Sequence, residues 1–279
     1  MTLHGLAYES NLLDDDGDAL LLIDVQNDFH PGGSLAIPTA DVDAEKTAKF
    51  IEEKGSGLSA IYMTLDTHQQ YHIAHPGFWV NVKGQHPKPF TCISHEDVAS
   101  KTWMPVHDTN SEWCLSYTKS LQQGGRFSLT IWPPHCLVGS HGHCVREVVQ
   151  SALLAWEIKY NKSVHYVLKG NNSLTEHYSA IRAEVVIPEK EVDTGSNKGI
   201  LDALSRHRRV LIGGQALSHC VNFTVRDLAL EWNQSDLASL VILEDTSSSV
   251  PGFEKEGDKF LDDMKHLGLT ISTTTTCLT

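Results

Sequence analysis

Short apolar runs rich in β-branched residues recur along the chain, and each run is bounded by turn or charged residues. The runs are Ala19–Val25, Ser59–Leu65, Val164–Leu168, Arg209–Gly213, Ser239–Leu243 and Gly268–Ser272. A run that is apolar on both faces is typical of a strand in a parallel sheet that is covered on each side. The sequence therefore predicts a central, mainly parallel sheet of six strands.

Helical periodicity is present between these runs. Apolar stripes with a period of 3.6 residues run through Ala44–Ile51, Val145–Trp156 and Val221–Trp232. Strands that alternate with helices form right-handed βαβ units. We therefore predict the α/β class, as a three-layer α/β/α sandwich.

One interval departs from this alternation. Residues from about 79 to 130, with Trp79, Trp103 and Trp113 among them, show no sustained period. We interpret the interval as a long insertion within a single domain spanning 1–279. Such a segment is either a surface loop packed on itself or a functional element, such as a lid or a subunit contact.

The charge balance restricts the partners that the protein can have. There are 22 Lys and Arg residues and 35 Asp and Glu residues, which give a formal net charge of −13. A surface this acidic repels nucleic acids and anionic lipids. Residues 1–18 lack the positive charge of a signal peptide, and the apolar run that follows is too short to span a bilayer. We expect a cytoplasmic protein with reduced cysteines, no nucleic-acid partner and no membrane partner.

Three reactive side chains lie at the ends of predicted strands, where ligands bind in sheets of this type. Burial at a strand end would raise the pKa of Asp24, as a general base requires, although such a carboxylate can equally be satisfied by backbone amides. Lys169 ends another strand, either beside an anionic group or as a solvated loop cation. Cys220 follows a turn of small residues at the start of a helix, where the helix dipole favours a thiolate unless the cysteine is only structural.

A second group of residues suits a metal ion. Asp66 and His68 follow one strand on the same side, and His72 and His75 come shortly after them. His135 is held after two prolines, which lowers the entropic cost of fixing its imidazole. An alternative interpretation is a local zinc cluster, although its spacing matches no usual zinc motif. That cluster would consist of His135, Cys136, His141, His143 and Cys144.

Taken together, these motifs resemble those of nicotinamidases, also called pyrazinamidases, within the isochorismatase-like cysteine hydrolases. The shared stretches are D-V-Q-N-D-F, D-x-H, W-P-P-H-C, K-G and G-x-A-x-x-H-C, in the order of the family. The resemblance extends from about Asp18 to Ser272, except for the interval after Trp79. The chain departs from the family at Ser218, where Asp is frequent, and at Ile181, where Phe is usual.

The resemblance implies a role for each matching residue. The implied catalytic triad is Asp24, Lys169 and Cys220. The implied metal ligands are Asp66, His68 and His135, with waters or a further residue, His72 or His75 being open, completing the shell. The substrate pocket would include Phe29, Trp132 and Ala216, with a cis peptide bond between Gln215 and Ala216 and an oxyanion hole formed by the Ala216 and Cys220 amides.

The implied reaction is the hydrolysis of nicotinamide to nicotinate and ammonia through a cysteine thioester, a step in NAD salvage. One divalent metal ion, zinc with iron or manganese as alternatives, would orient the pyridine ring. Two other functions remain open: a related cysteine amidohydrolase that acts on another small amide or an N-carbamoyl compound, and a catalytically silent binding protein. A homo-oligomer is also compatible with the sequence.

Overall fold

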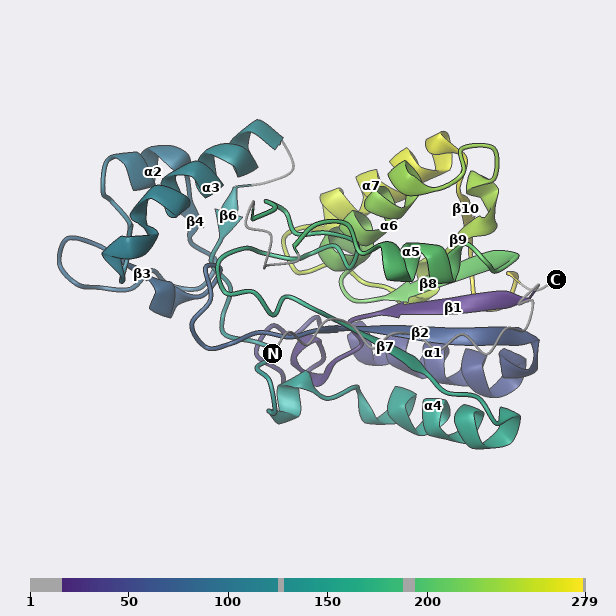
Figure 1. Cartoon of the computed structure of the whole chain (residues 1–279). Coiled ribbons are helices and arrows are strands. Elements are labelled where there is room, and N and C mark those ends of the chain that lie inside the picture. Colours follow the sequence, from purple (N-terminus) through teal and green to yellow (C-terminus); the bar gives the residue numbers. More distant parts are fainter. Residues whose placement is uncertain (1–16, 125–127, 188–193, 278–279) are drawn as a thin grey trace.

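The computed structural model describes residues 17–124, 128–187 and 194–277, and its centre is a six-stranded sheet (Figure 1). The strands follow the order β10-β9-β8-β1-β2-β7, and every neighbouring pair is parallel. All six predicted strands are present. They are β1 (Asp18–Ile23), β2 (Leu58–Asp66), β7 (His165–Lys169), β8 (Arg209–Gly214), β9 (Leu240–Leu243) and β10 (Thr270–Ser272).

Helices cover both faces of this sheet and confirm the three-layer α/β/α sandwich. One face carries α1 (Ala40–Lys54) and α4 (Glu147–Tyr160), and the other carries α5 (Lys198–Leu204), α6 (Asn222–Glu231) and α7 (Glu254–Leu267) (Figure 1). Helices α5 and α7 were not predicted from the sequence. Helix α5 has seven residues, and the buried side of α7 is reduced to Gly257, Phe260 and Met264, so neither has a wide apolar stripe.

Alternate residues of the strands enter two separate apolar cores. In β1, Leu20 and Leu22 pack in one core with Leu153 of α4, whereas Leu21 and Ile23 pack in the other with Leu228 of α6. Because side chains of a strand alternate between faces, a strand covered on both sides must be apolar throughout. This double burial is the physical reason for the continuous apolar runs in the sequence.

The insertion is more regular than the sequence pattern indicated. It contains β3 (Trp79–Val80), β4 (Cys92–Ile93), α2 (His95–Ala99), β5 (Met104–Pro105), α3 (Ser111–Gly124) and β6 (Leu129–Thr130). The expectation of no sustained period was wrong for α3, which buries residues at helical spacing. Those residues are Cys114, Tyr117, Thr118 and Leu121. The buried apolar residues of the insertion belong to the same core as the α6 face of the sheet.

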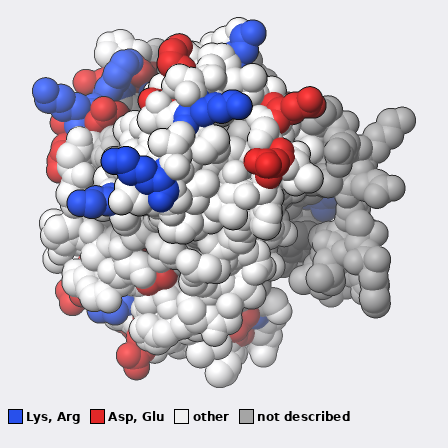
Figure 2. Space-filling model, turned by 90° about the vertical axis from the view of Figure 1, so that its left-hand side faces the viewer, with Lys and Arg blue, Asp and Glu red and all other residues white. Residues whose placement is uncertain are grey.

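The insertion lies beyond the end of the sheet at which β2 finishes (Figure 1). Figure 2 faces this end, and on the described residues visible there the positive and negative side chains are intermixed, with a broad uncharged area between them. Within the described ranges, no helix is long and apolar enough to span a membrane.

The register of the parallel strands brings their carboxyl ends together. Ile23 of β1 pairs with Thr64 of β2 and with Gly214 of β8, and Asp66 of β2 pairs with Lys169 of β7. Four strands therefore end at one edge of the sheet, at nearly the same level. Asp24, Asp66 and Lys169, which end or directly follow these strands, meet at this edge together with Cys220 from the turn after β8.

Candidate active site

A buried lysine joins the residues of the implied catalytic triad. The Lys169 Nζ atom lies 2.7 Å from Asp24 Oδ2 and 3.5 Å from Cys220 Sγ. The same ammonium group donates to Asp66 Oδ1 at 3.0 Å and to the His177 carbonyl at 2.9 Å. Asp24 is fully buried, and Lys169 and Cys220 are 3% and 6% exposed. The structure thus brings together three predicted residues that are far apart in the chain.

The local backbone directs these groups toward one another. Asp24 leaves β1 with a left-handed φ of 49°, and its Oδ1 accepts a hydrogen bond of 2.6 Å from the Thr64 hydroxyl. Cys220 lies in a π-helical turn, Leu217–Val221, between β8 and α6. The peptide bond between Gln215 and Ala216 is cis, as the resemblance implies.

Burial and charge set the protonation states of this cluster. Burial raises the pKa of Asp24 above its usual value, although Lys169 opposes the shift. Burial would favour a neutral Lys169, but the adjacent Asp24 and Asp66 carboxylates outweigh it and hold the lysine pKa well above its usual value. The cluster therefore combines an ammonium group with a carboxylate that is easier to protonate than a solvated one.

The helix dipole, which we expected to favour a thiolate at Cys220, is opposed by burial. Burial raises the thiol pKa well above its usual value, the Asp24 and Asp66 charges raise it further, and Lys169 only partly opposes them. The helix dipole is too weak to reverse a burial penalty of this kind. Cys220 thus rests as a neutral thiol and needs a base for deprotonation.

Three predicted metal ligands converge beside the triad. Single donor atoms of Asp66, His68 and His135 all lie within 4.8 Å of one another. Asp66 Oδ2 is 2.9 Å from His68 Nε2 and 3.3 Å from His135 Nε2. Burial favours protonated Asp66, but the His68 and Lys169 charges outweigh it and hold the Asp66 pKa well below its usual value.

The hydrogen bonding of His135 shows that this set fits a metal ion. Its Nδ1 lies 2.9 Å from the Pro133 carbonyl oxygen, which can only accept, so Nδ1 carries the proton. In the neutral ring the lone pair of Nε2 then faces the Asp66 carboxylate. Two lone pairs that face each other repel unless a cation lies between them. A metal-binding histidine also usually donates the N–H of its other ring nitrogen to a carbonyl oxygen or a carboxylate, as His135 does to Pro133.

The glycine of the K-G motif is explained by close packing against this metal set. Gly170 has a left-handed φ of 77°, and a Cβ atom there would lie 2.7 Å from Asp66 Oδ1 and 3.1 Å from His68 Cε1. Any side chain at this position would displace Asp66 and His68, two of the predicted metal ligands. The backbone must therefore pass close to the site without a side chain.

The alternative zinc cluster is not formed. Among the described residues, the only metal-ligand groups contain Asp66, His68 and His135, or His68, His72 and His75. Cys144 is exposed, His143 Nε2 lies 3.0 Å from the Thr67 hydroxyl, and Asn27 bonds to the His141 carbonyl. His135 thus belongs with Asp66 and not with the cysteines that follow it.

A small cavity of about 20 Å³ lies beside Cys220. Its lining contains the predicted pocket residues Phe29, Trp132 and Ala216 together with the metal ligands Asp66 and His135. Phe29 packs edge-on against His135, with ring centroids 5.6 Å apart. The predicted catalytic, pocket and metal residues therefore lie around or beside one space.

Six further lining residues were not among the predicted site residues. They are Leu35, Glu176, His177, Tyr178, His219 and Val250. Trp132 Nε1 donates to the Tyr178 hydroxyl at 2.8 Å, and the His219 ring packs edge-on against Trp132. The position of His219 next to Cys220 was a usable signal, but the segment around Glu176 has no strand or helix pattern to show its direction.

Glu176 adds a third buried carboxyl group to the site. Its Oε1 accepts a hydrogen bond from the His177 N–H at 2.9 Å and lies 3.9 Å from His68 Nε2. Burial raises its pKa, partly offset by His68. The cavity thus has a polar end, formed by Glu176 and the metal set, and an aromatic side formed by Phe29 and Trp132.

No protein-family model matches the chain. Two curated proteins are similar in sequence, and both are nicotinamidases. The Escherichia coli (strain K12) protein is 26% identical over 209 residues, which are 75% of this chain and 75% of that protein. The Acinetobacter baylyi protein is 26% identical over 228 residues, which are 81% and 79% of the two chains.

Solved structures of the same kind share the fold. A nicotinamidase/pyrazinamidase from Acinetobacter baumanii has a TM-score of 0.64 and 21% identity, covering 93% of this chain and 97% of that one. A Pyrococcus horikoshii pyrazinamidase in complex with zinc has a TM-score of 0.54 and 20% identity, with coverages of 92% and 99%. An L. infantum protein in complex with nicotinate has a TM-score of 0.59 and 20% identity, with coverages of 93% and 94%.

The parallel sheet, the buried lysine and the cysteine at the turn after β8 agree with the resemblance to the isochorismatase-like cysteine hydrolases, and the fold is that of the nicotinamidase structures. Within that class, the resemblance to nicotinamidases is confirmed by the relatives in sequence and by the structural neighbours. The match extends over most of the chain.

Proposed function

We propose that the protein hydrolyses nicotinamide to nicotinate and ammonia through a thioester on Cys220. The observation that carries this proposal is that the Asp24–Lys169–Cys220 cluster adjoins the cavity whose lining includes the metal ligands Asp66 and His135. An amide bond and a ring nitrogen of one small substrate can thus be held at the same time. The nicotinamidase relatives and the nicotinate-bound neighbour support this substrate.

The first half of the reaction forms the thioester. Asp24 accepts the proton of the Cys220 thiol, and Sγ attacks the carbonyl carbon of the amide. The Lys169 ammonium stabilises the carboxylate and the developing negative charge around it, and the backbone amides of Ala216 and Cys220 form the oxyanion hole. Asp24 then transfers its proton to the amide nitrogen, the carbon–nitrogen bond breaks, and ammonia leaves.

The second half releases the acid. Asp24, again ionised, removes a proton from a water molecule, and the resulting hydroxide attacks the thioester carbonyl. The carbon–sulfur bond breaks, and the proton held by Asp24 returns to Cys220. The raised pKa of Asp24 suits a group that must accept and donate a proton in each half-reaction.

Phe29 and Trp132 form the aromatic walls for the pyridine ring, and Ala216 forms the floor beside the nucleophile. Asp66, His68 and His135 hold one divalent ion, which when bound supplies a Lewis acid for the ring nitrogen. Two imidazoles and a carboxylate suit zinc, iron or manganese. We favour zinc because a structural neighbour is a pyrazinamidase in complex with zinc.

Four further predictions from the sequence complete this proposal. The protein acts in the cytoplasm, as a single domain over 1–279 with an insertion at about 79–130. A homo-oligomer remains compatible with the sequence. Production of nicotinate would place the protein in NAD salvage.

The direct test is ammonia release from nicotinamide by the purified protein. Wild-type protein should release ammonia and nicotinate in equal amounts, and Cys220→Ala should reduce the rate by roughly 10⁴-fold or more, since the covalent step depends on this thiol. Mass spectrometry of quenched wild-type protein should show the nicotinoyl group on Cys220. Cys92→Ala is the matched control, because Cys92 is exposed and lies in the insertion.

Three results would replace the proposal. Activity restricted to N-carbamoyl compounds would identify the related cysteine amidohydrolase. Nicotinamide hydrolysis that survives Cys220→Ala would remove the thioester mechanism. A wild-type protein that binds nicotinamide without hydrolysing any amide would identify a binding protein.

A further inference from the structure

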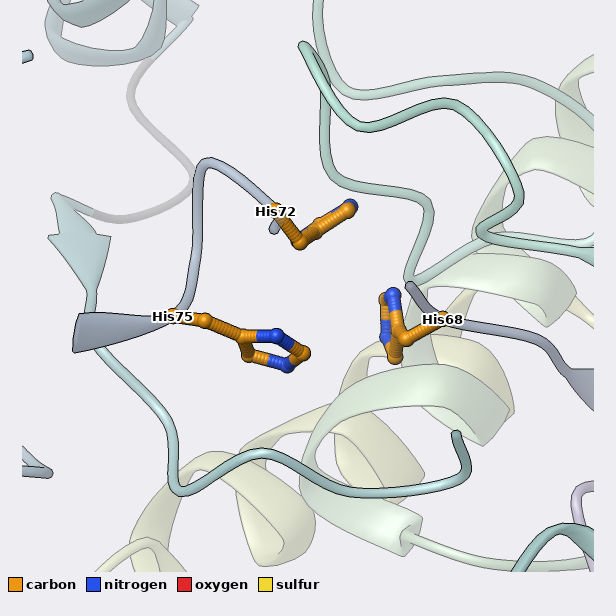
Figure 3. Close-up of side chains that lie close together, drawn as sticks. All are labelled: His68, His72 and His75. Carbon is orange, nitrogen blue, oxygen red and sulfur yellow. The ribbon is translucent and has the colours of Figure 1, made fainter. Parts of the chain in front are cut away.

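Three buried histidines, His68, His72 and His75, converge beside the metal ligands (Figure 3). One ring nitrogen of each lies within 4.8 Å of the other two, and the three side chains are at most 1% exposed. Nδ1 of His68 and Nε2 of both His72 and His75 have no hydrogen-bond partner within the described ranges. Buried polar atoms without partners are rare, so each of these nitrogens must serve a group that the protein does not supply.

The neighbouring backbone fixes which nitrogen of His75 and His72 carries the proton. His75 Nδ1 lies 3.3 Å from the Gln70 carbonyl oxygen, which can only accept, so Nδ1 is protonated and Nε2 of the neutral ring has a lone pair. The reverse holds for His72, because the Ala74 N–H donates to its Nδ1 at 3.2 Å. The proton of neutral His72 is therefore on Nε2. The two rings present opposite groups, an acceptor on His75 and a donor on His72.

His68 adds a second donor when it binds the metal. Its Nε2 faces Asp66 within the metal set, so a neutral His68 that coordinates through Nε2 carries its proton on Nδ1. The cluster then contains two N–H donors, on His68 and His72, and one acceptor, Nε2 of His75. Histidines that bind metals almost always donate their other N–H to a fixed acceptor.

We propose that His75 is a positioning residue of the metal centre: its Nε2 lone pair anchors the hydrogen bonding that holds His68 in the tautomer whose Nε2 binds the metal. The link is one buried water, which accepts from His68 Nδ1–H and His72 Nε2–H and donates to His75 Nε2. This inference rests on the metal centre of the proposed function.

The geometry of the cluster suits this water. One nitrogen of each ring lies within 4.8 Å of the other two, so these three nitrogens are no farther than about 2.8 Å from a common point, which is hydrogen-bond distance. We take them to be the nitrogens without hydrogen-bond partners, Nδ1 of His68 and Nε2 of His72 and His75. A buried water typically makes about three hydrogen bonds, which matches two donors and one acceptor. The same three histidines do not suit a second metal ion, because His72 has one nitrogen bonded to the Ala74 N–H and the other protonated.

The test is the zinc affinity of two variants, measured by competition with a colorimetric chelator. His75→Phe keeps a ring but removes the acceptor, and it should weaken zinc binding about 10- to 100-fold. His75→Gln keeps an acceptor oxygen, and it should stay within about threefold of wild type. Long-range ¹H–¹⁵N NMR of the zinc-loaded protein should show Nδ1–H of His68 in wild type and in His75→Gln.

A control variant and a Co²⁺ absorption spectrum distinguish a positioning role of His75 from direct coordination of the metal. His107→Phe removes an exposed histidine that packs on Tyr71 in the insertion, and it should leave zinc affinity unchanged. Undiminished affinity in His75→Phe would overturn the proposal. Equal losses in both His75 variants, together with a changed Co²⁺ spectrum, would also overturn it, because His75 would then be a ligand.

Zinc binding by wild type is measured first and independently of nicotinamide hydrolysis. A protein that binds zinc with the expected ranking of variants but does not hydrolyse nicotinamide would refute the proposed substrate and support the role of His75. If the protein hydrolyses nicotinamide but its zinc affinity is unchanged by His75→Phe, the proposed substrate is supported and the role of His75 is refuted.

Discussion

A single ammonium group lies between two buried carboxylates of the candidate active site. Lys169 contacts Asp24 and Asp66 and lies near the Cys220 thiol, all in a region closed to solvent. Unpaired buried carboxylates would carry a large desolvation penalty. The lysine therefore allows both carboxylates to stay buried, as the proposed roles of Asp24 as a base and Asp66 as a metal ligand require.

The pH dependence of the reaction provides a test of the role of Asp24. The Thr64 hydroxyl donates to Asp24 Oδ1 at 2.6 Å and stabilises the ionised form. Thr64→Val removes this donor, so the pKa of Asp24, already raised by burial, should rise further. Because only ionised Asp24 accepts the thiol proton, the acid limb of kcat/KM should move to higher pH.

Thr47→Val is the matched control for this prediction. Thr47 is a buried threonine of α1, whose hydroxyl donates to the Asp43 carbonyl away from the site. The acid limb of the kcat/KM pH profile of Thr47→Val should coincide with that of wild type. An acid limb that stays in place or moves to lower pH in Thr64→Val would show that Asp24 is not the essential base.

At the scale of elements, the insertion helix α3 is joined to the loop that follows β7. Trp113 Nε1 donates to the Leu174 carbonyl at 2.7 Å, and the Tyr117 hydroxyl accepts from the Glu176 N–H at 3.1 Å. The carbonyl oxygen of His177, in the same loop, accepts a hydrogen bond from the Lys169 ammonium group. The insertion therefore supports the backbone that orients the catalytic lysine.

Removal of the Tyr117 hydroxyl tests this support. Tyr117→Phe leaves the buried Glu176 N–H without its acceptor, which should lower the free energy of unfolding by about 1–3 kcal/mol. The loosened loop should also reduce kcat several-fold. Urea unfolding and steady-state kinetics measure the two effects.

Tyr71→Phe removes a comparable hydroxyl of the adjacent segment. That hydroxyl accepts from Asn110 and is only half-buried, so the variant should lose less than about 1 kcal/mol and retain its kcat. Equal effects of the two variants on kcat would show that α3 does not influence the active site through this loop.

At the scale of the whole molecule, the parallel sheet couples the metal site to folding. The proposed ligands Asp66 and His135 are distant in sequence and come together only when β2 and the segment after β6 are in place. An ion that binds only the folded state adds about 2.7 kcal/mol at 100 times its Kd. For a chain of this size, that corresponds to an increase in Tm of roughly 5 °C.

Thermal unfolding with and without zinc measures this coupling. Chelator-treated wild type should gain stability on addition of zinc, and His135→Ala should lose most of the gain. Magnesium should give little increase, because it prefers oxygen ligands. A wild-type Tm that does not change on addition of zinc would contradict a metal site formed by the folded protein.

Much of the fold and site was predictable because it depends on local patterns. The six strands are apolar on both faces, and their runs remain visible in the sequence whatever their neighbours. Asp24, Lys169 and Cys220 stand at strand or turn boundaries, and parallel strands bring such boundaries to one edge. The helical spacing of the buried residues of α3 was present in the sequence but was missed among the irregular segments around it. The cavity residue Glu176 was not predictable, because its burial depends on packing between distant segments.

The sequence by itself determined the strands, their parallel arrangement and the residues available for chemistry, because periodicity and residue type are properties of the chain. Only the tertiary structure decided the protonation of Cys220, where burial among charges outweighs the helix dipole. It likewise gave His72 and His75 opposite hydrogen-bonding roles, through the Ala74 amide and the Gln70 carbonyl. Burial and hydrogen-bond direction arise from atoms that meet in space, and these set the chemistry of residues that the sequence can only name.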